Sequence, residues 1–236
     1  MITNNSIGKL SIGPSLVTDG LILYLDAASK RSYVGGSTWT DLTKNSNNFE
    51  INGGVQHNGK YFSLNGSTSQ YFQSNPFSHP TEDFTIELYE RITEFNLTPF
   101  YSYAVLGDDN EGLLYLPSDS SAEIQIRGPA GQVNTGFAIE LNKFYQIARV
   151  RISSSGDEKL YINGDLAFEG TLAAGQSTQA NGSFNVGQEQ DSPGGGFRDT
   201  QTIIGDVSIV RVYDRALSPQ EISTNYQEIQ SRFIGV

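Results

Sequence analysis

The stretch GDVSIVRVYDRALSPQEI, residues 205–222, decides the fold because it specifies a strand and then a helix. Residues 205–213 alternate with the period of two that a strand requires. We expect Ser208, Val210 and Val212 on one face of this strand and the side chains between them on the other. Apolar residues occur on both faces, so the strand is predicted to lie inside a sheet.

The second half of the stretch carries a helix start signal. Ser218 is the expected N-cap, Pro219 suits the first helical position, and Glu221 follows the cap by three residues. This spacing is a capping box, in which the Glu221 carboxylate can accept a hydrogen bond from the Ser218 amide. The apolar stripe expected on this helix consists of Ile222, Tyr226 and Ile229.

The composition favours a folded, β-rich chain. The 236 residues include 13 Phe and 12 Tyr for a core, and 25 Gly and 8 Pro for turns. A net charge of −11 opposes nucleic-acid binding. The absence of cysteine excludes disulfides, thiolate metal sites and a cysteine nucleophile. No apolar run has the length of a signal peptide or a membrane span, so we expect neither secretion by a signal peptide nor a membrane protein.

From residue 49 onward, short apolar runs alternate with turn signals about every ten residues, as in a sandwich or barrel. Asn163-Gly164 is the strongest hairpin signal, since a type I′ turn needs positive φ at both central positions. The predicted organisation is an extended N-terminal arm, residues 1–19, followed by one domain, residues 20–236. Candidate strands are 21–25, 49–51, 61–64, 70–73, 84–92, 101–106, 112–116, 122–127, 144–152, 159–162, 166–169 and 184–186.

Several segments in order along the chain resemble the concanavalin A-like lectin/glucanase superfamily. They are GLILYLDAASKRSY, TWTDLTKNSNN, YFSLNGSTSQYFQ, DFTIELYERI, KFYQIARVRISSSGDEKLYINGDL, FNVGQ and IGDVSIVRVYDRALSPQEISTNY. The chain is most similar to laminin-G-like jelly-roll modules, and the form of its first segments resembles those of tailed-phage virion structural proteins. The resemblance implies an all-β, two-sheet antiparallel jelly-roll sandwich with a short C-terminal helix, in which the first and last strands lie together.

The catalytic acids of the superfamily's glucanases are missing. Those enzymes carry alternating carboxylates on one strand, which period-two geometry points to one face. Here Glu87 stands alone on its face, and Glu90 is expected on the opposite face. The two histidines, His57 and His79, lie in expected loops and lack a nucleophile motif. We therefore expect no catalytic residues and no enzyme.

Two kinds of binding site remain open. No obligatory cofactor is expected, but calcium would suit the acidic turn GDDNEG and the glycine-rich loop after residue 190, with Asp108, Asp109 and Asp191 as candidate ligands. These acids serve equally as solvated turn formers. Carbohydrate would need exposed aromatic side chains, and the candidates are Trp39, Tyr101, Tyr103, Tyr115 and Phe197. For Trp39 the competing interpretation is an anchor that holds its loop on the sheet.

The resemblance suggests a non-enzymatic phage virion structural protein, either a capsid decoration or a tail or fibre component. The alternative is a glycan-binding adsorption module for host-surface carbohydrate. In the first case the partners would be other virion proteins, bound through the N-terminal arm. A homo-oligomer and a surface glycan are further candidate partners. The expected location is the virion, after synthesis in the host cytoplasm.

Overall fold

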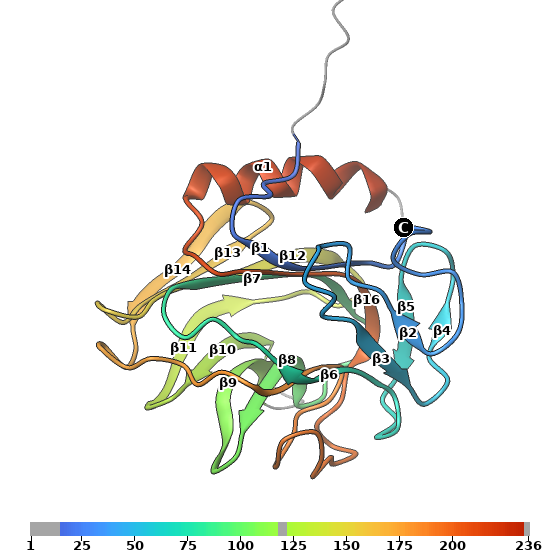
Figure 1. Cartoon of the computed structure of the whole chain (residues 1–236), viewed down its shortest axis with the longest axis horizontal. Coiled ribbons are helices and arrows are strands. Elements are labelled where there is room, and N and C mark those ends of the chain that lie inside the picture. The colour runs from blue at the N-terminus through green and yellow to red at the C-terminus, as the bar shows by residue number, and fades with distance from the viewer. Residues whose placement is uncertain (1–14, 118–121, 234–236) are drawn as a thin grey trace, which may run out of the picture.

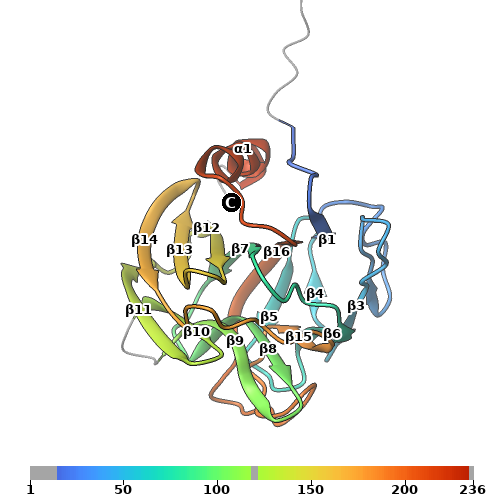
Figure 2. The same ribbon diagram turned by 60° about the vertical axis from the view of Figure 1, so that its left-hand side comes forward.

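Two antiparallel sheets face each other across a shared hydrophobic core in the computed structural model, which describes residues 15–117 and 122–233 (Figure 1). A single α-helix of the described residues, α1 (Pro219–Ile229), covers the outer face of one sheet and continues into a 3₁₀ turn, Gln230–Phe233. Figure 2 shows α1 end-on, on the far side of that sheet from the other sheet. The predicted jelly-roll sandwich with a C-terminal helix is confirmed.

We call the sheet under α1 the helix-side sheet and the other the loop-side sheet. The strands of the helix-side sheet, in spatial order, are β14 (Asp165–Thr171), β13 (Asp157–Ile162), β12 (Phe144–Ile152), β7 (Phe84–Ile92), β16 (Ile204–Tyr213), β5 (Phe62–Asn65) and β4 (Gln56–His57), with β1 (Leu21–Asp26) also paired to β16. Those of the loop-side sheet are β11 (Gly131–Ala138), β10 (Glu123–Gly128), β9 (Asp108–Leu116), β8 (Thr98–Val105), β15 (Gly182–Val186), β6 (Tyr71–Phe77), β3 (Phe49–Asn52) and β2 (Thr38–Trp39).

The deciding stretch forms β16 and α1, and β16 is an interior strand as predicted. It pairs with β7 along one side, and with β1 and β5 along the other. The predicted alternation was wrong at one end, because the register shifts between Val207 and Ile209. This bulge at Ser208 places Val207 in the core with Val210 and Val212. A bulge inserts one residue, and therefore reverses the face of every side chain before it.

The capping box is present at the start of α1. The Ser218 Oγ accepts a hydrogen bond from the Glu221 amide at 3.4 Å, and the Glu221 Oε2 accepts one from the Ser218 amide at 2.8 Å. Ile222 and Ile229 are buried against the sheet, as the predicted stripe requires. The third position of the helix's buried face is Asn225, a polar side chain whose role becomes clear in the site beneath the helix.

The predicted arm is only partly described. Residues 1–14 lie outside the described residues. Val17 already contacts the domain, since its amide donates to Asn225 Oδ1 at 2.9 Å and its carbonyl accepts from the Tyr213 hydroxyl at 3.1 Å. The boundary between arm and domain at residue 20 stays a prediction. The chain already contacts α1 at least three residues before it.

The hairpin prediction at Asn163-Gly164 is confirmed. The two residues join β13 to β14 with φ of 54° and 87°. The strand β11 and the two short strands β2 and β4 were not predicted, because few apolar residues mark them. Among the described residues, no helix is long and apolar enough to span a membrane.

The long loop between β15 and β16, residues 187–203, covers the outer face of the loop-side sheet, opposite the helix (Figure 1). Gln190 Nε2 donates to the carbonyls of Ser102 and Ser183 at 3.1 and 2.8 Å, and Gln190 Oε1 accepts from the Gly194 amide at 2.7 Å. Gly194 packs on the side chains of Asn75 and Gln73, which both belong to β6. The loop is thus held on the sheet by amide side chains.

Candidate functional site

The two glutamates of β7 lie on opposite sides of the helix-side sheet, as predicted, and cannot act as a catalytic pair. Glu90 points into the interior, and no hydrogen bond to its carboxylate is found among the described residues. Burial raises the pKa of Glu90 well above its usual range. Glu87 lies on the outer face of the sheet, where α1 covers it and leaves it 2% exposed.

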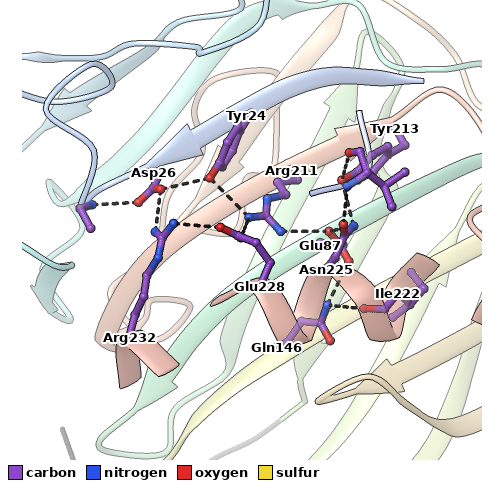
Figure 3. A network of polar contacts seen from close by, with 12 residues as sticks. Tyr24, Asp26, Glu87, Gln146, Arg211, Tyr213, Ile222, Asn225, Glu228 and Arg232 are labelled. Atoms are coloured by element: carbon purple, nitrogen blue, oxygen red, sulfur yellow. Dashed lines mark hydrogen bonds and ion pairs between the residues drawn. The ribbon is translucent and has the colours of Figure 1, made fainter. Parts of the chain in front are cut away.

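A buried polar cluster surrounds Glu87 beneath α1 (Figure 3). The Glu87 carboxylate accepts hydrogen bonds from Gln146 Nε2 at 3.0 Å and Asn225 Nδ2 at 2.9 Å, and lies 3.6 Å from Arg211 Nη1. Burial raises the pKa of Glu87 to about 7, although Arg211 opposes the shift. Arg211 Nη2 also contacts Glu228 at 3.2 Å. The cluster joins the helix to the sheet through buried contacts.

Neither histidine is a loop residue exposed to solvent. His79 is buried and stacks on Tyr103, with ring centroids 4.5 Å apart, and its Nδ1 contacts the Pro80 carbonyl oxygen at 2.7 Å. Burial lowers the pKa of His79 to about 4, so its ring is neutral near pH 7. His57 lies in β4, and its ring packs edge-on against Tyr33. Within the described residues, the ring nitrogens of both histidines contact backbone carbonyl oxygens and not a hydroxyl.

A second buried ionic cluster lies inside the sandwich. Glu158 contacts Arg149 Nη2 at 2.7 Å and Arg151 Nη1 at 2.9 Å, and all three side chains are at most 1% exposed. Arg149 Nη1 also donates to the Tyr101 hydroxyl at 2.5 Å. Arg151 Nη1 and Nη2 also donate to backbone carbonyls, whereas the buried Arg151 Nε makes no hydrogen bond within the described residues. Its role is to hold β12 and β13 against the opposite sheet.

Three of the five predicted carbohydrate residues are inaccessible. Trp39, Tyr101 and Tyr103 are fully buried, and the Trp39 ring contacts Phe62 and Phe72. Trp39 therefore anchors its loop, which was the competing interpretation. A sugar cannot reach these three rings, because they are packed inside the core of the sandwich. Tyr115 and Phe197 do line surface hollows.

Tyr115 lies in a hollow of about 350 Å³ on the outer face of the loop-side sheet, which we call the polar hollow. It is lined by Leu97, Asn110, Leu113, Tyr115, Pro117, Gln125, Arg127, Gln132, Glu189, Asp191 and Gln201. The Tyr115 hydroxyl donates to Gln125 Oε1 at 2.8 Å and lies 3.1 Å from Gln132 Oε1. Burial raises the pKa of Tyr115, so its hydroxyl stays protonated. The hollow therefore presents amide, hydroxyl, guanidinium and carboxylate groups together.

The sequence missed the amide residues of this hollow. Gln125 and Arg127 alternate with the buried Ile124 and Ile126 on β10, so the period of the strand could have placed them on the outer face. Gln201 carried no such signal, because it comes from the irregular loop before β16. Its Oε1 is buried and makes no hydrogen bond within the described residues.

The calcium candidates are only partly brought together. The acidic segment was predicted as a turn, and this was wrong, because β9 begins at Asp108 and the turn is at Leu106-Gly107. Of the candidate ligands, Asp191 lines the polar hollow and Asp108 does not. The side chain of Asp109 lies outside the described residues. Glu111 is buried and accepts a hydrogen bond from the Gln179 amide at 2.5 Å.

The polar hollow nevertheless has the donor chemistry of a calcium site. Glu189 and Asp191 line it from the loop, and Asn110 lines it from β9. Calcium takes hard oxygen ligands from carboxylates, amide oxygens and carbonyls, and Gln201 Oε1 adds an acceptor without a partner. Asp191 already pairs with Arg198 Nε at 2.6 Å. In the described part of the chain, no three acidic or histidine side chains gather as a complete metal site.

The chain has extended similarity to known proteins. Residues 61–233 match the Pentaxin family. C-reactive protein of Homo sapiens is 30% identical over 172 residues, which are 70% of this chain and 74% of that protein. Serum amyloid P-component of Cavia porcellus is 31% identical over 147 residues, 62% of this chain and 65% of that protein. A native heptameric SAP-like pentraxin from Limulus polyphemus shares the fold, with a TM-score of 0.58 and 22% identity over 68% of this chain and 78% of that chain.

Fold and similarity together define a lectin-like jelly-roll protein with the concanavalin A-like fold. Within that class, the chain belongs to the pentaxin family. Pentaxins are non-enzymatic binding proteins, which agrees with the prediction that the chain is not an enzyme.

The virion assignment was wrong. The relatives are C-reactive proteins and serum amyloid P-components of mammals, which are serum proteins and not phage capsid, tail or fibre components. The predicted virion location fails on the same finding, and virion partners are not supported. The quoted segments identify the fold, and pentaxins share that fold with virion modules. The segments therefore could not separate the two.

Proposed function

We propose that this pentaxin is a non-enzymatic binding module whose ligand is a hydroxyl-rich molecule of glycan type, held in the polar hollow. The observation that carries the proposal is the concentration of amides around Tyr115. Gln125 and Gln132 hold the Tyr115 hydroxyl, and their remaining amide groups can donate to and accept from a ligand. The volume of the polar hollow, about 350 Å³, lies within the range of small-ligand sites, which is about 300–1,000 Å³.

Calcium is part of the proposal because the loop carboxylates fit it. Asn110, Glu189 and Asp191 would hold the ion, and the carbonyls and amide oxygen nearby could complete its shell. A bound calcium would supply a positive charge that accepts ligand hydroxyl or anionic oxygens. Arg127 lines the hollow from β10 and provides a second positive charge, which is permanent. The family's known calcium binding supports this part.

Self-association is proposed as well. The Limulus polyphemus relative is described as heptameric, and a ring of copies would multiply weak single-site affinity. Sedimentation velocity of the purified chain tests this point separately from ligand binding. A single monomeric species across the accessible concentration range would remove it.

The test of the binding function is a glycan array probed in calcium and again in EDTA, followed by calorimetric titration of calcium. Asp191→Asn is expected to weaken calcium binding by at least about tenfold, because it removes one charged ligand. Asp199→Asn is the matched control, since Asp199 lies exposed in the same loop and does not line the hollow. Equal affinities of the two variants would exclude calcium at Asp191. A wild-type protein that binds no glycan in either buffer would overturn the proposal.

A further inference from the structure

A second surface hollow lies beside the loop between β15 and β16. It has a volume of about 590 Å³, and we call it the aromatic hollow. Its lining consists of Asn52, Gly53, Thr68, Ser69, Tyr71, Gly196 and Phe197. These residues come from the end of β3 and the turn after it, from the start of β6 and the turn before it, and from the loop between β15 and β16. A site assembled from three separate segments has a shape fixed by the sandwich that holds them.

The chemistry of the aromatic hollow differs from that of the polar hollow. Tyr71 and Phe197 are half-buried, with ring centroids 4.5 Å apart and planes inclined by 52°. The Asn52 Nδ2 donor is buried and makes no hydrogen bond within the described residues. The hydroxyls of Thr68 and Ser69 add further donors and acceptors. No charged side chain is among the lining residues.

This combination suits a neutral sugar ring. The C–H faces of a sugar are apolar and pack on an aromatic ring, while its hydroxyls need amide and hydroxyl partners around the edge. A charged group on the ligand would gain no electrostatic stabilisation here, because the lining offers no opposite charge. The polar hollow, by contrast, contains Arg127, Glu189 and Asp191.

The two hollows are neighbours across one tight turn. Asp191 lines the polar hollow and Gly196 lines the aromatic hollow, and the two residues touch: a Cβ on Gly196 would lie 2.8 Å from the Cβ of Asp191. The turn between them is closed by hydrogen bonds between Ser192 and Gly195, the shorter of them 2.9 Å long. The positive φ of 74° at Gly196 makes this close return of the chain possible.

We infer that the aromatic hollow is a second subsite, which takes a neutral sugar ring of the same oligosaccharide that occupies the polar hollow. This inference rests on the proposed function and adds to it that the ligand is a chain of sugars longer than one residue. Phe197 and Tyr71 supply the stacking surface, and Asn52 supplies the free donor.

The test uses the full chain and a glycan bound on the array, cut into fragments of increasing length from one sugar upward. Wild-type affinity, measured by calorimetry, is expected to rise about tenfold or more once the fragment reaches the second hollow. With Phe197→Ala, longer fragments should bind no more tightly than the shortest one. Asn52→Ala is a second variant that leaves the rings in place. It should reduce the rise in affinity with fragment length by several-fold.

Phe168→Ala is the matched control, because Phe168 is another half-buried phenylalanine, on β14 of the helix-side sheet. It should keep the wild-type dependence on length, and thermal unfolding of each variant checks that it is folded. The subsite is excluded if Phe197→Ala retains the length dependence, or if it weakens every fragment by the same factor. If the wild type binds no glycan at all, the proposed function fails first and the subsite with it.

Discussion

Replacing Arg211 by Met is expected to destabilise the protein in a way that depends on pH. Arg211 is the cation nearest to Glu87 beneath α1, with 3.6 Å between Nη1 and Oε2 and side chains 1% and 3% exposed (Figure 3). Removing one member of a buried ion pair leaves the other charge without compensation. Glu87 can escape that state only by taking up a proton.

The magnitude follows from the pKa of Glu87, which is raised from 4.5 to about 7 in the folded protein. Because the folded value lies above the unfolded one, folding stability is greatest below the unfolded pKa and falls as the pH rises through the folded pKa. In the wild type this loss stops near pH 7. Without Arg211 the pKa of Glu87 rises further, so the loss continues by about 1.4 kcal/mol for each pH unit.

The assay is urea unfolding of wild type and Arg211→Met at about pH 5 and about pH 8. At the lower pH, Glu87 is protonated in both folded proteins, and the difference in unfolding free energy reflects lost packing, lost hydrogen bonds and the lost ion pair with Glu228. At the higher pH, the difference should be larger by about 1.4 kcal/mol.

Glu228→Gln is the control for this experiment, since it removes the outer partner of Arg211 and leaves Arg211 beside Glu87. Its cost should be about 1 kcal/mol or less, because Glu228 is partly exposed. An Arg211→Met penalty of the same size at both pH values would refute the assignment of Arg211 as the group that stabilises the Glu87 charge.

Three further predictions concern single features. Ser218→Ala should lower the free energy of unfolding by about 1 kcal/mol through loss of the helix cap, measured by urea titration, without changing ligand binding. Arg198→Ala should strengthen calcium binding up to about fivefold in calorimetry, because it frees Asp191 from a partly exposed ion pair. Weaker binding would show that Arg198 helps to form the site. Gly164→Ala should cost about 1–2 kcal/mol in thermal unfolding, because φ is 87° and the new Cβ would lie 3.3 Å from Ser223 of α1. A variant as stable as wild type would exclude strain at this turn.

The sequence was sufficient where a local rule has one structural solution. The Ser218 capping box and the Asn163-Gly164 hairpin depend on backbone geometry within a few residues, and both are present. The pairing of β1 with β16 came from the family resemblance, and the register confirms it.

The sequence was insufficient where a side chain is placed by distant partners. Arg149 and Arg151 were not expected in the interior, because their burial depends on Glu158 and on carbonyls from separate turns. Tyr101 was a candidate for sugar contact, but its ring fills the core and its hydroxyl meets Arg149.

The polar hollow was only partly predictable. Asp191 was chosen from its expected loop and Tyr115 as an aromatic residue, and the structure places both at one hollow. Gln125 could have been added from strand alternation. Gln201 could not, because the irregular loop that carries it has no period from which its direction could be inferred.

β1 pairs with β16, and α1 packs on the outer face of the helix-side sheet. Both ends of the described chain therefore lie on that side of the molecule. The loop with both hollows lies over the other sheet (Figure 1). A surface, a label or a fused protein attached at either end would therefore leave the binding face turned outward. Copies anchored by their ends would all present that face in the same direction, as a dense coating on a bead or sensor.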